Sequence, residues 1–209
     1  GFVSRGLGDV YKRQLIAAWN ATSALEWVSV AFGIAYIVLA TRENIWCWPA
    51  ALIGTATAII LFWDVSLLME SALNVYYLVM ALYGWYQWRY GSKDHNTLAI
   101  QRWQTHQHLI AIAVILVLTL ASGFGLERFT QADYPFIDSF TTWAAVFTTW
   151  MVARKVLENW LYWVVIDAVS VWLFWQKELY LYALLFVAYT VIAVFGYREW
   201  RSRYHHAAN

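Results

Sequence analysis

Polar and aromatic side chains recur at helical spacing inside long apolar stretches of this chain. Glu70, Asn74 and Tyr77 are spaced i, i+4, i+7, so they share one face of a helix. Trp163 and Asp167 begin a second set with the same spacing, which ends at residue 170. Charged groups cost about 2.5–3.5 kcal/mol each at the centre of a membrane helix, so their positions are informative. Such faces predict a cavity that binds a small polar ligand.

Two further stripes extend the predicted cavity. Trp48, Leu52 and Thr55 repeat the spacing of the Trp163 stripe 115 positions earlier, and a stripe at 182, 186 and 189 repeats the Glu70 stripe 112 positions later. Four helices are therefore expected to turn equivalent stripes inward. The candidate substrate-binding residues are Trp48, Thr55, Glu70, Asn74, Tyr77, Trp163, Asp167, Ser170, Tyr182 and Tyr189.

Each candidate also has a structural alternative. Asp167 and Asn74 are equally consistent with hydrogen bonds between helices, and Glu70 with solvation near the outer boundary. Tryptophans are typical of an interfacial belt, and hydroxyl groups more often bond carbonyls of their own helix. Two further residues, Gly84 and Gly196, are expected to allow close helix packing rather than to bind a ligand.

The chain contains an internal repeat. Residues 61–88 realign on residues 173–200 at an offset of 112, with eleven of the 28 pairs identical. Upstream, Glu43-Asn44 recurs as Glu158-Asn159 at an offset of 115, which implies that about one helical turn is gained or lost between the copies. Similar halves are typical of a transporter, because two alike bundles can rock about a central site.

Composition places the chain in a membrane. It is 62% hydrophobic, has a mean hydropathy of +0.49 and carries 13% charged residues, against about 25% in soluble domains. A net charge of +1 excludes a basic nucleic-acid-binding protein. Cys47 is the one cysteine, so an intrachain disulfide is excluded, and the five histidines lie in hydrophilic segments, so no metal site is expected.

Seven apolar segments predict an all-α polytopic membrane protein. The second and third match the sixth and seventh, so the repeating unit is three helices, and the fourth segment has no partner. This unpaired helix keeps both units the same way up, which gives a 3+1+3 arrangement of parallel repeats like that of SWEET-type carriers. The segments are 24–41, 46–63, 67–88, 107–126, 137–154, 159–176 and 179–198.

The repeat divides the chain into four parts. Residues 15–91 form the first three-helix bundle, 92–130 a linker loop and linker helix, and 131–209 the second bundle with a tail. Residues 1–14 are polar and glycine-rich, and we expect them to lie outside the fold, as a tail that could be non-native. Nine lysines and arginines on one side of the membrane against two on the other, or five with the tail, predict an outer N-terminus and a cytoplasmic C-terminus.

Several classes of function lack their motifs. The chain has no phosphate-binding G-x-x-x-x-G-K-[ST] loop and no H-E-x-x-H or G-x-S-x-G signature, so an enzyme is not expected. Residues 179–197 contain no lysine, which excludes a retinal protein, and no TVGYG-like run suggests a selective channel. No cofactor is expected.

Motifs spread over residues 20–203 resemble the nicotinamide riboside transporter (PnuC) family. The resemblance implies two three-helix bundles joined by a linker helix, and a carrier in the bacterial inner membrane that works by facilitated diffusion with alternating access and metabolic trapping. It also implies that three copies can associate as a homotrimer. The motifs are Trp46-Cys47-Trp48-Pro49, Asn74-x-x-Tyr77, Tyr83-Gly84-Trp85-x-x-Trp88, Glu158-Asn159-Trp160, Trp163-x-x-x-Asp167 and Gly196-Tyr197-x-x-Trp200.

The predicted stripes suit nicotinamide riboside, a flat cation. Aromatic faces can hold its pyridinium ring, Asp167 or Glu70 can balance its charge or bind ribose hydroxyls, and Asn74 can pair with its carboxamide. No lysine or arginine lies at mid-membrane depth to receive a phosphate, so a mononucleotide is not expected. Two alternatives stay open: another unphosphorylated cargo such as thiamin, riboflavin or a deoxynucleoside, and a seven-helix protein that transports nothing.

Overall fold

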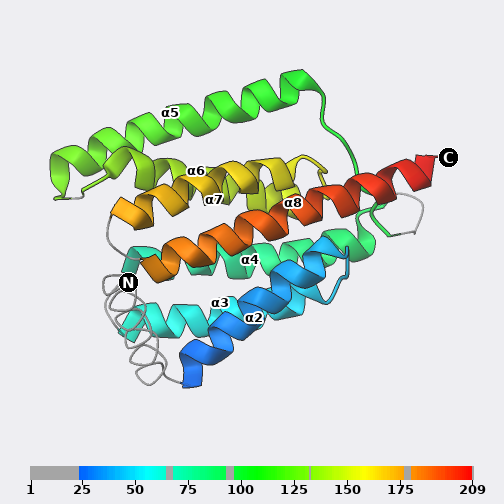
Figure 1. Ribbon diagram of the computed structural model, residues 1–209, viewed down its shortest axis with the longest axis horizontal. Helices are drawn as coiled ribbons and strands as arrows, with labels where there is room; N and C mark the ends of the chain where they lie inside the picture. Colours follow the sequence, from blue (N-terminus) through cyan, green and yellow to red (C-terminus); the bar gives the residue numbers. More distant parts are fainter. Residues whose placement is uncertain (1–23, 65–67, 93–96, 132, 177–179, 209) are drawn as a thin grey trace, which may run out of the picture.

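In a computed structural model, the described residues are 24–64, 68–92, 97–131, 133–176 and 180–208, and they form seven helices (Figure 1). This part of the chain contains no strand, only an isolated bridge between Gln101 and Val156. The all-α prediction is confirmed, and residues 1–14 lie outside the described part. The helices are α2 Ala24–Thr41, α3 Cys47–Asp64, α4 Leu68–Tyr90, α5 Thr105–Phe129, α6 Pro135–Ala153, α7 Asn159–Gln176 and α8 Tyr180–Ala208.

Six of the helices form a closed ring. Helices α2, α3 and α4 pack in chain order, as do α6, α7 and α8, and the two sets meet where α4 packs on α6 and α8 packs on α2. Helix α5 packs closely along α6 and meets α7 through side chains such as His108, whose Nδ1 lies 2.9 Å from the Tyr162 hydroxyl, so it lies outside the ring, along one edge of the molecule (Figure 1).

The two halves of the ring correspond at an offset of 112 throughout. Helix α3 begins and ends 112 residues before α7, and α4 begins 112 residues before α8. The turns after α2 and α6 correspond in the same way, since Glu43 and Lys155 are the two non-glycine residues with positive φ, at 57° and 51°, among the described residues. The offset of 115 expected upstream is therefore wrong. Trp48 corresponds to Trp160 instead of Trp163, and position 55 corresponds to 167.

Reciprocal hydrogen bonds join the two halves at one end. Trp88 Nε1 donates to the Val152 carbonyl at 3.1 Å, and Trp200 Nε1 donates to the Ala40 carbonyl at 2.9 Å. Donors and acceptors are each 112 residues apart, and the two rings meet with centroids 5.9 Å apart. The acceptors lie at the C-terminal ends of α2 and α6, where helix carbonyls lack α-helical partners. Each also accepts a turn amide at 3.0 Å, that of Glu43 for Ala40 and that of Lys155 for Val152. The tryptophans therefore add a second hydrogen bond to each of these carbonyls and join the two halves at this end.

Charge reinforces this junction. Glu43 and Lys155, the corresponding turn residues, form an ion pair of 2.5 Å across the two halves. The Lys155 ammonium also lies 4.6 Å from the centroid of the Trp88 ring, in cation–π geometry. Lys155 is buried, so both contacts compensate the cost of removing its charge from water.

Two glycines make room for buried tryptophans on the same side of the ring. A Cβ atom at Gly84 would overlap the ring of Trp48, and one at Gly196 would overlap the ring of Trp160. Trp48 packs edge-on against Trp88, with centroids 5.4 Å apart, and Trp160 packs in the same way against Trp200 at 5.5 Å. The expectation that both glycines allow close packing is confirmed.

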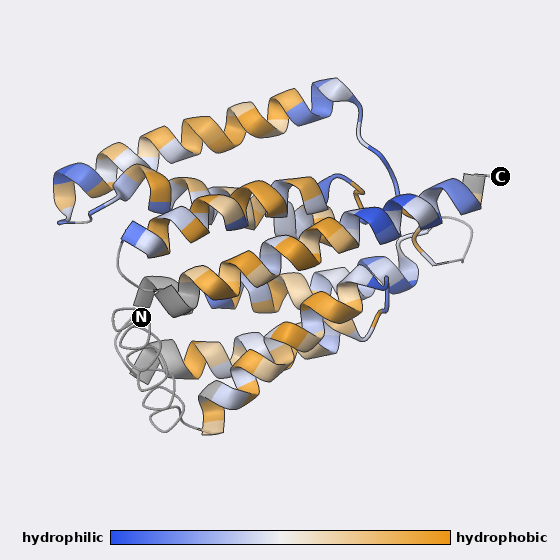
Figure 2. Cartoon of the chain, in the orientation of Figure 1, coloured by the Kyte–Doolittle hydropathy of each residue, from blue (hydrophilic) through white to orange (hydrophobic). Residues whose placement is uncertain are grey.

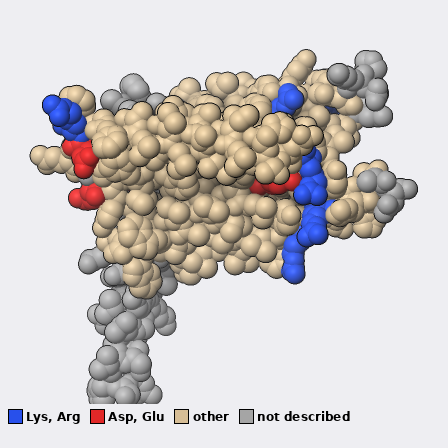
Figure 3. Space-filling view, turned by 90° about the horizontal axis from the view of Figure 1, so that it is seen from above, with Lys and Arg blue, Asp and Glu red and all other residues tan. Residues whose placement is uncertain are grey.

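The outer surface of the bundle is apolar along most of its length. Figure 2 shows hydrophobic residues along the helices and hydrophilic ones toward their ends, and Figure 3 shows charged side chains gathered toward the two ends of one face. Among the described helices, Thr105–Phe129 and Ala183–Ala207 are long and apolar enough to cross a membrane. Leu109, Val117 and Phe124 are each at least 60% exposed on α5, which suits a helix surrounded by lipid.

Replacing either close-packed glycine by alanine should destabilise the protein. In Gly84→Ala or Gly196→Ala the added methyl group displaces a buried tryptophan, at a cost of about 1–3 kcal/mol. We expect a lower midpoint of thermal unfolding, followed by tryptophan fluorescence in detergent. Gly125→Ala is the matched control, because a Cβ atom there meets nothing within 4 Å. Equal midpoints in all three variants would contradict the packing described.

Candidate functional site

Asp167 is a buried acid without a countercharge. It lies in the middle of α7, only 4% exposed, and its carboxylate makes no hydrogen bond or ion pair with any described residue. A carboxylate in such a position must either bind a proton or pair with a cation supplied from outside the chain, because an isolated buried charge is costly. Asp167 is therefore the strongest candidate for contact with a positively charged ligand.

Helices α7 and α8 also carry a cluster of aromatic side chains. Tyr189 lies on α8, the helix that packs on α7. Tyr189 packs edge-on against Phe186, with centroids 5.7 Å apart, and Phe186 stacks on Phe174 at 5.2 Å with an angle of 23° between the rings. Carboxylates and aromatic faces both attract flat cations, so these two helices carry the kinds of group that an aromatic cation needs.

The corresponding place in the first half carries no charge. Thr55 stands 112 residues before Asp167, and its hydroxyl donates to the Ala51 carbonyl at 2.8 Å. Asn74 and Tyr77 are half-buried on α4, where the Tyr77 ring lies 5.7 Å from that of Tyr76. Tyr77 corresponds to Tyr189 at the offset of 112, so the two halves present similar aromatic groups, while Asp167 has an uncharged counterpart in Thr55.

The remaining candidates divide between the core and positions that the structure leaves undescribed. Ser170 is buried and donates to the Ile166 carbonyl at 2.9 Å, the bond within its own helix that a structural role predicts. Trp163 is half-buried and packs against both apolar clusters of the protein. The side chains of Glu70 and Tyr182 lie outside the described residues.

Trp48 has a counterpart in the second half of the repeat, Trp160, that the sequence analysis did not identify. Trp48 and Trp160 occupy corresponding positions, each is 2% exposed, and the indole N–H of each lacks an acceptor in the described structure. A buried donor without an acceptor costs about 1–3 kcal/mol, so both indoles are candidates to donate to a ligand. Continuing the offset of 112 upstream, in place of 115, would have identified Trp160.

Comparisons with known proteins agree on one family. The family model described as "Nicotinamide mononucleotide transporter" matches residues 23–202. The nicotinamide riboside transporter PnuC of Escherichia coli (strain K12) is 27% identical over 204 residues, covering 85% of each chain. The riboflavin/roseoflavin transporter RibM of Streptomyces davaonensis is 24% identical over 184 residues, again covering 85% of each chain.

A solved structure has the same fold. The crystal structure of the vitamin B3 transporter PnuC matches with a TM-score of 0.70 and 21% sequence identity. The match covers 96% of this chain and 90% of the other. The seven-helix architecture is therefore shared over nearly the whole of both proteins.

Neutralising Asp167 should stabilise the ligand-free protein. In Asp167→Asn the buried charge is replaced by an uncharged group of similar size, which removes a desolvation penalty that no described partner offsets. At pH 8 we expect thermal unfolding to shift upward, by the equivalent of roughly 1 kcal/mol or more. Asp133→Asn is the control, because Asp133 is exposed and pays no such penalty. A lower midpoint in Asp167→Asn alone would reveal a structural partner for the acid.

Proposed function

The chain belongs to the nicotinamide mononucleotide transporter family, and we propose that it carries nicotinamide riboside across a membrane by facilitated diffusion. The buried carboxylate of Asp167, which has no counterion among the described residues, is the observation that carries this choice of cargo. The riboside has a flat cationic ring, which needs both a countercharge and aromatic faces. The Escherichia coli relative, named as a nicotinamide riboside transporter, supports the same cargo.

A phosphorylated cargo fits the described residues less well. A mononucleotide brings a phosphate of charge near −2, which Asp167 would repel in the low dielectric of the interior. Described lysines and arginines lie in loops or in helix ends, such as Arg89 in the last turn of α4 and Arg128 in the last turn of α5. The unphosphorylated riboside, trapped after transport by phosphorylation in the cytoplasm, is therefore the proposed cargo.

The transport mechanism rests on a proposed pair of like-oriented bundles. Residues 15–91 and 131–209 form the two three-helix bundles, and 92–130 form the linker with α5, in a SWEET-like 3+1+3 arrangement. Exchanging corresponding helices turns the α4–α6 contact into the α8–α2 contact, as a pseudo-twofold axis along the membrane normal requires. Rocking of one bundle against the other would then expose the site to each side in turn.

Riboflavin is the runner-up cargo. The relative RibM is named as a riboflavin and roseoflavin transporter, and riboflavin also has a flat ring system that aromatic side chains can hold. Riboflavin carries no positive charge, however, so it leaves the Asp167 carboxylate without a partner. The same acid therefore separates the two cargoes, and thiamin or a deoxynucleoside can be tested beside them.

Uptake into liposomes tests the cargo. We expect saturable uptake of labelled nicotinamide riboside without ATP or an ion gradient. Asp167→Asn should weaken binding about tenfold or more, because a hydrogen bond to a charged group contributes about 1.5–3 kcal/mol. Wild type should bind the uncharged, reduced form of the riboside more weakly than the cation. In Asp167→Asn this difference in affinity should disappear.

The control for this experiment is Ser170→Ala, which removes a hydroxyl already bonded within its own helix. It should transport at nearly the wild-type rate. Competition by riboflavin or thiamin but not by the riboside would replace the proposed cargo, and binding without flux would argue against a carrier. Equal affinity of wild type and Asp167→Asn for the cation would remove this acid from the site.

We also propose a bacterial inner-membrane location with an outer N-terminus, a cytoplasmic C-terminus and assembly as a homotrimer. The orientation is supported by Arg198, Arg201 and Arg203, which lie near the C-terminal end of α8, because basic residues favour the cytoplasmic side. Cross-linking of purified protein would test the trimer, where a single-chain band at every cross-linker concentration would exclude it.

Accessibility of two introduced cysteines tests the orientation. Asp133→Cys, between α5 and α6, should react with an impermeant maleimide in intact cells, whereas His206→Cys, near the end of α8, should react only after permeabilisation. The native Cys47 is fully buried and supplies a low background. Labelling of both positions from the same side would contradict an odd number of membrane crossings between residues 133 and 206.

A further inference from the structure

A cavity of about 570 Å³ lies outside the helix ring, between α5 and α7. Asp167 is not among its lining residues, so it is separate from the site described above. It forms because α5 approaches α6 more closely than α7, so the space between α5 and α7 is incompletely filled. The lining residues are Arg102, Trp103, Thr105, His108, Ile112, Ile115, Leu116, Phe140, Ala144, Glu158, Leu161, Tyr162, Val165 and Ile166.

The walls of this groove are apolar and open to the surroundings. Ile112 and Leu116 of α5 and Leu161 and Val165 of α7 are between 43% and 54% exposed. From Thr105 to Leu116 a helix rises roughly 16 Å, at about 1.5 Å per residue. The hydrocarbon core of a bilayer is about 30 Å thick, so the groove runs about the depth of one leaflet.

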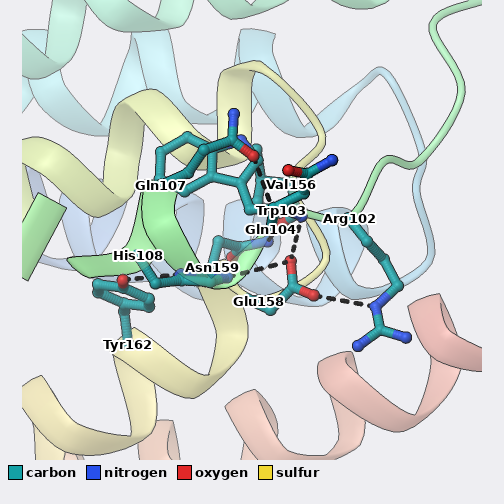
Figure 4. A network of polar contacts seen from close by, with 9 residues as sticks. All are labelled: Arg102, Trp103, Gln104, Gln107, His108, Val156, Glu158, Asn159 and Tyr162. Atoms are coloured by element: carbon teal, nitrogen blue, oxygen red, sulfur yellow. Dashed lines mark hydrogen bonds and ion pairs between the residues drawn. The ribbon is translucent and has the colours of Figure 1, made fainter. Parts of the chain in front are cut away.

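The mouth of the groove is polar and contains the Arg102 guanidinium, only part of which is hydrogen-bonded (Figure 4). Glu158 accepts a hydrogen bond from Arg102 Nε at 3.1 Å through one oxygen, and from the Trp103 amide at 3.2 Å through the other. His108 Nδ1 and the Tyr162 hydroxyl lie 2.9 Å apart beside them. The Arg102 side chain is 54% exposed, and its terminal nitrogens have no partner among the described residues.

We infer that this groove binds one anionic glycerophospholipid, with its phosphate on Arg102 and an acyl chain between α5 and α7. The terminal nitrogens of a guanidinium form a fork that matches a phosphate. An anionic lipid is favoured over a zwitterionic one, because the Glu158 carboxylate is already paired with Arg102 and is only 10% exposed, so it offers little contact to a headgroup ammonium. The lipid fills the open side of α5 and links this helix to the second half of the ring.

Native mass spectrometry of the full chain in detergent with added phosphatidylglycerol tests the site. Wild type should retain one phosphatidylglycerol per chain, and phosphatidylcholine should bind more weakly. Arg102→Gln should bind phosphatidylglycerol about fivefold more weakly, since a basic side chain contributes about 1 kcal/mol to attraction of anionic lipid. Arg201→Gln, at an exposed position, is the matched control and should bind phosphatidylglycerol as tightly as wild type does. Equal loss in both variants, or equal binding of the two lipids, would overturn the proposal.

A second pair of variants tests the apolar part of the groove without altering a charge. Val165→Trp fills the groove and should abolish retention of phosphatidylglycerol, whereas Val194→Trp, at an exposed position on α8 outside the groove, should not. Retention by Val165→Trp, or a dimer in place of a lipid adduct in wild type, would also overturn the inference. Retention of the lipid does not depend on which cargo the protein transports. The lipid proposal therefore stands or falls separately from the proposed uptake of the riboside.

Discussion

Two tryptophans, each donating its indole N–H to the other half of the chain, hold the helix ring closed. Trp88 and Trp200 donate to carbonyls at the C-terminal ends of α6 and α2, which also accept hydrogen bonds from the turns that follow these helices. In a medium without water these bonds are not replaced when they break, so separating the halves at this end is costly. The Glu43–Lys155 ion pair at the same end adds a charge contact between corresponding turns. The junction therefore restricts the relative positions of the two halves on which any site between them depends.

A nearly symmetric scaffold carries asymmetric chemistry. The close-packed glycines, the buried tryptophans and the turns with positive φ all recur at the offset of 112. The polar groups do not recur in this way. Thr55 occupies the position that corresponds to Asp167, and Glu43 occupies the position that corresponds to Lys155. This division has a physical reason, because equivalent packing contacts at corresponding positions require side chains of the same shape. A single cation needs one countercharge, and a second buried acid would repel the first and leave one of them unpaired.

Helix α5 plays a different part from the other helices. It has no counterpart in the repeat and packs on α6, so its remaining surface must be covered by lipid or by another molecule. The polar cluster of Arg102, Glu158 and His108 lies where α5 begins, and the apolar walls extend from there along the helix. This order of polar and apolar groups follows that of a phospholipid from headgroup to chain.

The sequence by itself determined the helices, because apolar runs long enough for a bilayer can form little else. The expected segment 159–176 coincides with α7, and the unpaired segment 107–126 lies within α5. Asp167 was also recognisable, as a charge in an apolar run. Tertiary structure alone decided how the halves correspond, since a match of Glu43-Asn44 to Glu158-Asn159 favoured 115 while the folded turns follow 112. It alone placed Trp48 against Gly84 and opened a groove beside α5, because contacts between distant segments depend on packing that no local spacing encodes.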